Sequence, residues 1–243
     1  MKHIKKILLL SLSLVLLCIC AFGQSVVIKP KTITYRRPKP FSEYKKTFTV
    51  TYPKVSGSSA ALNKKIESSI SYEKAADVNI KDELGDVQWL EEATYKVNYN
   101  KNGILGITLS VSGSGAYPSS YDRTVVVDLA AGNRVRPADV FVNLSGLAAK
   151  CRRIQQSEVK RSLADIKKNE PDAEDPESLF AEAKFTTEDL KEFTVSDRGV
   201  AFFYDYGFPH VLQALQPEGR YFIPWSEMKP FIKPGGLLAR FVH

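Results

Sequence analysis

The chain has 243 residues, of which 44% are hydrophobic, enough to build a hydrophobic core without disulfides. Its formal net charge is +7, and residues 1–23 contribute three lysines and no acids, so the rest of the chain carries 31 − 27 = +4. That charge argues against a nucleic-acid-binding protein, in which a concentrated basic face is expected.

Residues 1–23 have the pattern of a signal peptide. Three lysines precede an apolar stretch over residues 7–20, and Ala21-Phe22-Gly23 places small residues where a signal peptidase acts. We expect cleavage before Gln24 and an exported protein, periplasmic or extracellular. The apolar run is shorter than the ~20 residues of a membrane span. The residues immediately before Cys18 and Cys20 are Leu17 and Ile19, whereas a lipoprotein signal has a small residue at that position, which argues against a lipid anchor.

The next segment, residues 24–44, contains three prolines and little periodicity, which predicts an extended linker. A domain is predicted over residues 45–243. It begins with alternating apolar residues that predict a strand ending at Pro53. Ser58 or Ser59 can then cap a helix, whose apolar residues are spaced by four: Leu62, Ile66 and Ile70.

The clearest strands lie between Thr94 and Phe141. Apolar residues alternate in three runs, around Val97, Leu109 and Val127, which predicts three antiparallel strands. A turn at residues 101–103 joins the first two. The connection over residues 112–121 is rich in glycine and small polar residues, which favours either a binding loop or an ordinary mobile connection. The domain could also divide into two packed halves near residues 113–123.

A long helix is predicted over residues 143–168, with Cys151 on its apolar face. Prolines in residues 169–178 end it. Short helical segments are expected at residues 179–184 and after Thr187. A second sheet follows, with strands around residues 193–195, 200–204 and 221–224, and a helical turn over residues 225–231. Because the other two cysteines leave with the leader, Cys151 can form no internal disulfide, and we expect a buried, unreactive thiol.

The sequence offers few catalytic groups. Only His210 and His243 follow the leader, and no spacing typical of a zinc site, a phosphate loop or a nucleophilic serine occurs. His210 with Asp205 and a serine could form a triad, although a lone histidine is more often structural. Four acidic residues could supply a carboxylate pair for glycoside chemistry, although a charged helix surface explains them more simply: Glu182, Glu188, Asp189 and Glu192. We therefore predict no catalytic residue, no metal and no cofactor.

Several short motifs occur in an order that resembles a known family. They are Thr51-Tyr52-Pro53-Lys54-Val55-Ser56-Gly57, the Gly-Ala-Tyr-Pro of residues 115–118, Asp139-Val140-Phe141, Gly199-Val200 and Ile223-Pro224-Trp225. In this order the chain resembles the extracytoplasmic domain of RsiV-type anti-sigma factors, over roughly Tyr44 to Phe231. A similar region precedes the catalytic domain of some peptidoglycan deacetylases. The resemblance implies an α+β fold, with antiparallel sheets and helices packed on one side, and a receptor that binds lysozyme.

The chain departs from that family in two respects. Tyr117 stands where many relatives carry a histidine. Only six residues precede the apolar run, so we expect no cytoplasmic sigma-binding region and no anti-sigma activity, and no deacetylase domain is expected after the domain.

The leading hypothesis is an exported, non-enzymatic binding module of the cell envelope. Its partner would be a protein such as lysozyme or a cell-wall glycan. The alternatives are an envelope hydrolase or esterase acting through His210 and acidic partners, and a purely structural envelope component. Aromatic residues near loop rims suit recognition, so one shared binding surface is predicted from four residues: Tyr117, Tyr121, Phe208 and His210.

Overall fold

The computed structural model describes residues 25–42, 44–115, 117–170 and 175–242. The signal-peptide prediction therefore lies outside the described residues. The chain divides into two compact units, with the boundary between Arg134 and Val135. The predicted split near residues 113–123 differs from this boundary, because Gly113 pairs with Ser119 and Val111 with Tyr121 inside the first unit.

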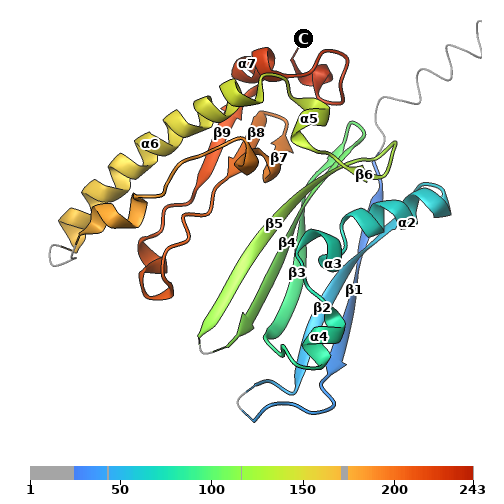
Figure 1. Ribbon diagram of the computed structural model, residues 1–243. Helices are drawn as coiled ribbons and strands as arrows, with labels where there is room; N and C mark the ends of the chain where they lie inside the picture. The colour runs from blue at the N-terminus through green and yellow to red at the C-terminus, as the bar shows by residue number, and fades with distance from the viewer. Residues whose placement is uncertain (1–24, 43, 116, 171–174, 243) are drawn as a thin grey trace, which may run out of the picture. The chain divides into compact units, whose positions relative to one another are not determined.

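Unit 1 is built on a six-stranded sheet in the order β1-β2-β3-β4-β5-β6 (Figure 1). The strands are β1 (Val27–Arg36), β2 (Thr47–Ser56), β3 (Leu90–Lys101), β4 (Ile104–Ser114), β5 (Pro118–Asp128) and β6 (Asn133–Arg134). Neighbours are antiparallel except β2 and β3, which are parallel. A parallel pair needs a crossover connection, and three helices supply it on one face of the sheet: α2 (Ala60–Ser69), α3 (Tyr72–Ala75) and α4 (Ile80–Leu84) (Figure 1).

Strand β1 corrects the prediction of a linker over residues 24–44. It pairs with β2 in unbroken register from Val27 opposite Ser56 to Arg36 opposite Thr47. The prolines misled the prediction, because proline normally argues against a strand. Proline is tolerated in an edge strand, and Pro30 lies in the edge strand of this sheet, opposite Pro53.

The core of unit 1 lies between the sheet and the three helices. The predicted stripe of the first helix is confirmed, with Ser59 as the N-cap and with Ile66 and Ile70 fully buried. Apolar residues of β2, β4 and β5 face these helices, and they include Phe48, Val50, Ile107, Leu109, Val125 and Val127.

The three predicted antiparallel strands are confirmed as β3, β4 and β5. The connection predicted over residues 112–121 is shorter than expected. Ser112 pairs with Ser120 and Ser114 with Pro118, so both strands extend into it. Ladder hydrogen bonds are made by the backbone, and they continue here even though glycine and serine are poor strand formers. Close packing explains why position 113 is a glycine: a Cβ there would lie 2.1 Å from the Trp89 carbonyl oxygen.

Unit 2 combines a long helix with a three-stranded antiparallel sheet in the order β7-β8-β9. Its helices are α5 (Pro137–Val140), α6 (Leu144–Asn169) and α7 (Trp225–Met228), and its strands are β7 (Phe193–Ser196), β8 (Gly199–Phe203) and β9 (Arg220–Pro224). Short 3-10 segments are η1 (Pro176–Phe180), η2 (Glu188–Lys191), η3 (His210–Leu215), η4 (Lys229–Phe231) and η5 (Ala239–Phe241). The predicted long helix, second sheet and final helical turn are confirmed.

The core of unit 2 is rich in aromatic rings. Phe141 packs against Phe193 and Phe202 with ring centroids 5.3 and 5.6 Å apart. Cys151 is fully buried, and burial raises its pKa to about 12. Both units combine sheets and helices, so the expected α+β class is confirmed. Within the described part of the chain, no helix is both long and apolar enough to span a membrane.

Candidate functional site

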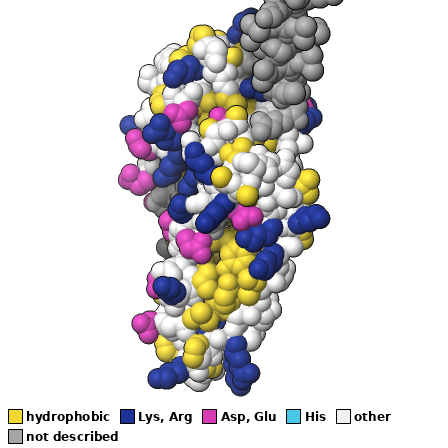
Figure 2. All heavy atoms as spheres, turned by 90° about the vertical axis from the view of Figure 1, so that its right-hand side faces the viewer, with side chains coloured by type: hydrophobic (Ala, Val, Ile, Leu, Met, Phe, Trp, Pro, Cys, Tyr) yellow, Lys and Arg dark blue, Asp and Glu magenta, His cyan; other side chains and the backbone are white. Residues whose placement is uncertain are grey.

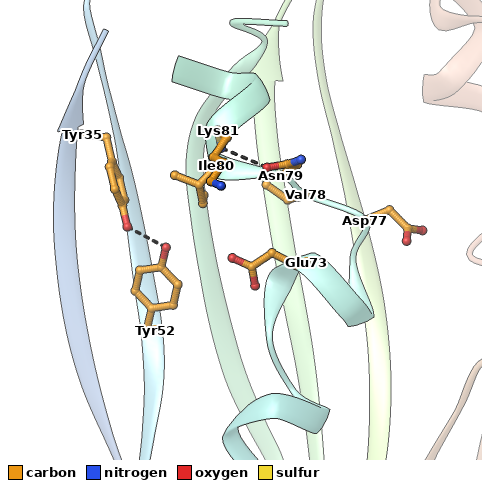
Figure 3. Close-up of a pocket in the computed structure, with 8 residues that line it drawn as sticks. All are labelled: Tyr35, Tyr52, Glu73, Asp77, Val78, Asn79, Ile80 and Lys81. Carbon is orange, nitrogen blue, oxygen red and sulfur yellow. Dashed lines mark hydrogen bonds between the residues drawn. The ribbon is translucent and has the colours of Figure 1, made fainter. Parts of the chain in front are cut away.

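A hollow in unit 1 lies between the β1–β2 hairpin and the α3–α4 segment, and we call it the tyrosine hollow (Figure 3). It has a volume of about 620 Å³. Its lining residues are Tyr35, Tyr52, Glu73, Asp77, Val78, Asn79, Ile80 and Lys81. Figure 2 shows hydrophobic side chains gathered on this side of the molecule, with Lys, Arg, Asp and Glu around them. The hollow is large enough for a small ligand or part of a polymer.

Two tyrosine hydroxyls form one wall of the tyrosine hollow. The Tyr35 and Tyr52 hydroxyl oxygens lie 2.8 Å apart and share a hydrogen bond. Both rings are held by neighbours, Tyr35 stacked on Phe48 at 5.1 Å and Tyr52 edge-on to Tyr72 at 6.0 Å. Burial, and after it the contact with Tyr35, raises the pKa of Tyr52. The Tyr52 hydroxyl is therefore neutral at physiological pH. Since the bond between the two hydroxyls uses one hydrogen, the second hydrogen is left for a ligand.

The opposite wall carries carboxylates. In Figure 3 the Glu73 carboxylate points toward the tyrosine pair, while that of Asp77 points away from it. Among the described residues, neither Glu73 nor Asp77 forms a salt bridge. The Asn79 side chain caps α4 by accepting a hydrogen bond from the Lys81 backbone N–H at 3.0 Å. The two tyrosine hydroxyls and the Glu73 carboxylate thus face the same space.

A second hollow adjoins the first and shares Asp77, Val78 and Asn79 with it; we call it the tryptophan hollow. Its volume is about 360 Å³, and its other lining residues are Asp82, Glu83, Val87, Trp89, Ser119 and Tyr121.

Stacked rings dominate the tryptophan hollow. Trp89 and Tyr121 lie with centroids 6.0 Å apart and planes at 15°. Trp89 Nε1 donates to Ser119 Oγ at 3.2 Å, and the Tyr121 hydroxyl donates to the Ala76 carbonyl oxygen at 2.8 Å. Because both polar ends are occupied, the rings are fixed in place before any ligand arrives.

A buried ion pair supports this part of the unit. Arg37 donates to the carbonyl oxygens of Lys45 (2.6 Å), Glu83 (3.0 Å) and Leu90 (2.7 Å). Its Nη2 lies 3.5 Å from Glu83 Oε2, which also accepts from the Leu90 N–H at 2.7 Å. The guanidinium carbon lies 4.8 Å from the centre of the Phe48 ring. These contacts fix α4 and the start of β3 to the end of β1.

The structure separates the four predicted binding residues between the two units. Tyr121 lines the tryptophan hollow, and Tyr117 is 63% exposed beside the β4–β5 turn. Phe208 is only 5% exposed and packs edge-on to Phe180 at 5.1 Å, so it is a core residue of unit 2 rather than a surface anchor. His210 is exposed at the start of η3. A surface shared by all four stays a prediction.

Two of the acidic residues considered for catalysis, Asp205 and Asp189, accept hydrogen bonds from neighbouring residues. The Asp205 carboxylate, considered as the partner of His210, accepts from the Gly207 N–H at 2.9 Å and from Gln216 Nε2 at 3.3 Å. Asp189 accepts from the backbone N–H and the hydroxyl of Thr186. Within the described ranges, no group of three or more His, Cys, Asp and Glu side chains could hold a metal ion.

Sequence reasoning missed most of this site. Tyr35 lies in the segment that was expected to be a linker, and Tyr52 lies in a predicted strand and in the Thr51–Gly57 motif, neither of which indicates a binding site. Trp89 lay in a segment without clear periodicity. The one available signal was the size and apolar character of Trp89, which favour burial, but no sequence pattern places it beside the glycine-rich connection.

The fold and the site together define an α+β protein with a preformed hollow of aromatic rings, tyrosine hydroxyls and a carboxylate. No protein-family model matches the sequence, and neither does the sequence of a curated protein. The structure is similar to the crystal structure of a DUF3298 family protein from Pseudomonas aeruginosa PAO1, with a TM-score of 0.56 and 14% identity, over 87% of this chain and 96% of that chain. A DUF3298 family protein from Bacteroides fragilis NCTC 9343 has a TM-score of 0.49 and 12% identity, over 88% of this chain and 95% of that one. At this identity the first likeness shows a common fold and nothing more.

Proposed function

We propose that this protein is an exported, non-enzymatic binding module of the cell envelope, and that unit 1 recognises a cell-wall glycan through the tyrosine and tryptophan hollows. The signal-peptide pattern of residues 1–23 supports export. The motif order supports an RsiV-type domain, with which the DUF3298 fold is compatible.

One observation carries the choice of ligand: the fixed Tyr35–Tyr52 hydroxyl pair faces the Glu73 carboxylate across a hollow of about 620 Å³. A sugar ring presents hydroxyl groups at its edge and C–H groups on its faces. Carboxylate oxygens accept from such hydroxyls, and a neutral tyrosine both donates and accepts. The stacked Trp89–Tyr121 pair in the adjoining hollow offers a rigid apolar surface for a further ring.

The fixed geometry also favours recognition energetically. Aromatic side chains that are already held by hydrogen bonds lose little conformational entropy when a ligand binds. Two hollows that share a wall at Asp77, Val78 and Asn79 suit a polymer whose successive units occupy both.

The test is retention of the purified protein by insoluble peptidoglycan, compared with retention by immobilised lysozyme. Tyr52→Phe removes one hydroxyl from the tyrosine pair and should weaken binding to the glycan roughly two- to tenfold, the value of one hydrogen bond. Glu73→Gln keeps the shape of the side chain and removes its charge, and it should also weaken binding.

Matched controls exist in the same unit. Tyr95→Phe changes a half-buried tyrosine outside the hollows, and Asp86→Asn changes an exposed acid outside them; neither should alter binding. The proposal fails if peptidoglycan does not retain the protein, or if all four variants bind as the unchanged chain does. Retention by lysozyme alone would replace the glycan with a protein partner, as the RsiV-type resemblance implies.

A further inference from the structure

Unit 2 contains a groove along helix α6 that the proposed function does not use. Its volume is about 480 Å³, within the ~300–1,000 Å³ typical of small-ligand sites. Seven of its lining residues form one stripe of α6: Gln155, Gln156, Val159, Lys160, Leu163, Ala164 and Lys167. At 1.5 Å per residue the stripe is about 18 Å long. Phe180 and Ala183 line the groove from outside the helix.

Gln155, which lines the groove, has a buried side-chain atom without a hydrogen-bond partner among the described residues. The side chain is 1% exposed, and its Oε1 accepts a hydrogen bond from the Phe185 N–H at 2.7 Å. That bond fixes the orientation of the amide, because the opposite orientation would place two donors against each other. Gln155 Nε2 is buried and has no hydrogen-bond partner among the described residues. Since a buried donor without an acceptor is costly, the arrangement favours a ligand oxygen at this position.

The charges of the groove favour an anion at one end only. None of its nine lining residues is acidic. Lys167, near the far end, forms an ion pair with Glu177. Lys160 forms no salt bridge with any residue that the structure describes, and it lies five positions, about 7.5 Å along the axis, from Gln155. Unbalanced positive charge is therefore near Gln155, while the other end is neutral and apolar.

We propose that this groove binds the anion of a single-chain fatty acid. One carboxylate oxygen accepts a hydrogen bond from Gln155 Nε2, and the Lys160 ammonium balances the charge. The aliphatic chain lies along Val159, Leu163 and Phe180, whose side chains are apolar and belong to the groove wall. The site lies in unit 2 and is independent of the glycan proposal for unit 1.

The test uses the full chain and dodecanoate below the concentration at which it forms micelles. Binding is followed by the methyl NMR signals of Val159 and Leu163, which report on the groove and not on residues 7–22. Dodecanoate should shift these signals in a saturable manner. Methyl dodecanoate, which has the same chain and no charge, should bind about tenfold or more weakly.

Two substitutions locate the carboxylate. Lys160→Glu reverses an exposed charge without disturbing the core and should weaken dodecanoate binding about tenfold or more. Lys168→Glu makes the same change on the same helix outside the groove, and it should leave the affinity unchanged. Gln155→Glu keeps an acceptor for the Phe185 N–H and removes the amide donor, so it should also weaken binding.

Three outcomes would overturn the proposal: no saturable shift of the two methyl signals, equal affinity for the ester and the carboxylate, or equal effects of Lys160→Glu and Lys168→Glu. If Gln155→Glu lowers the melting temperature, Lys160→Glu alone decides the result, because Lys160 is exposed.

Discussion

Arg37 should be one of the most important residues for the stability of unit 1, and Arg37→Ala tests this directly. The side chain of Arg37 has no exposed surface, and that of Glu83 is 8% exposed. Removing the guanidinium leaves three backbone carbonyl oxygens without their donor and leaves the Glu83 carboxylate buried beside only the Leu90 N–H. Breaking a buried pair in this way costs about 3–5 kcal/mol, so we expect a loss of that size.

The measurement is the free energy of unfolding in urea, followed by the fluorescence of Trp89 in a Trp225→Phe background so that unit 1 is observed by itself. Arg36→Ala is the matched control, since Arg36 is the preceding residue of the chain and its side chain is exposed. Surface changes of this kind usually alter stability by less than about 0.5 kcal/mol.

A double-mutant cycle separates the ion pair from the other contacts of Arg37. Glu83→Leu removes the carboxylate. In that background Arg37→Met should lower the free energy of unfolding by at least about 1 kcal/mol less than it does in the unchanged chain, because it no longer leaves an unpaired charge. Equal stability of Arg37→Ala and Arg36→Ala would refute the reasoning. It would mean that the Arg37 contacts contribute nothing to holding α4 and β3 against β1.

Three further predictions concern single groups. Cys151 should react slowly with a thiol reagent at pH 8 in the native protein and rapidly in urea, because a pKa of about 12 leaves about one thiol in ten thousand ionised; equal rates would contradict this. Gly113→Ala should destabilise unit 1 by about 1–3 kcal/mol in urea unfolding, since its Cβ would meet the Trp89 carbonyl; an unchanged midpoint would count against the close packing. Burial raises the pKa of Cys151 from 9.0 and those of Tyr72 and Tyr221 from 10.0, so these groups ionise at lower pH in the unfolded state than in the folded state. Their full contribution to the free energy of unfolding is present below pH 9, and above it that free energy should fall by up to about 1.4 kcal/mol per pH unit for each group. A free energy of unfolding that stays constant between pH 8 and 11 would exclude this.

The sequence by itself determined the local elements of this protein. The alternation in β3, β4 and β5, the stripe through Ile66 and Ile70, and the apolar face of α6 are properties of neighbouring residues. Each pattern has a period of 2 or 3.6 residues and can be recognised without a partner. The burial of Cys151 followed for the same reason, because its position on the helix stripe already indicated the core side.

Only the tertiary structure decided the site. Tyr35 and Tyr52 are 17 residues apart, and their hydroxyls meet because β1 pairs with β2 in a register that no local pattern specifies. Glu73 faces them because the crossover from β2 to β3 passes over the same face of the sheet. Phe208 shows the reverse case, since an aromatic residue beside a loop suggested a surface anchor, and packing against Phe180 buries it. Burial and long-range register depend on which segments meet, and that is a property of the folded chain as a whole.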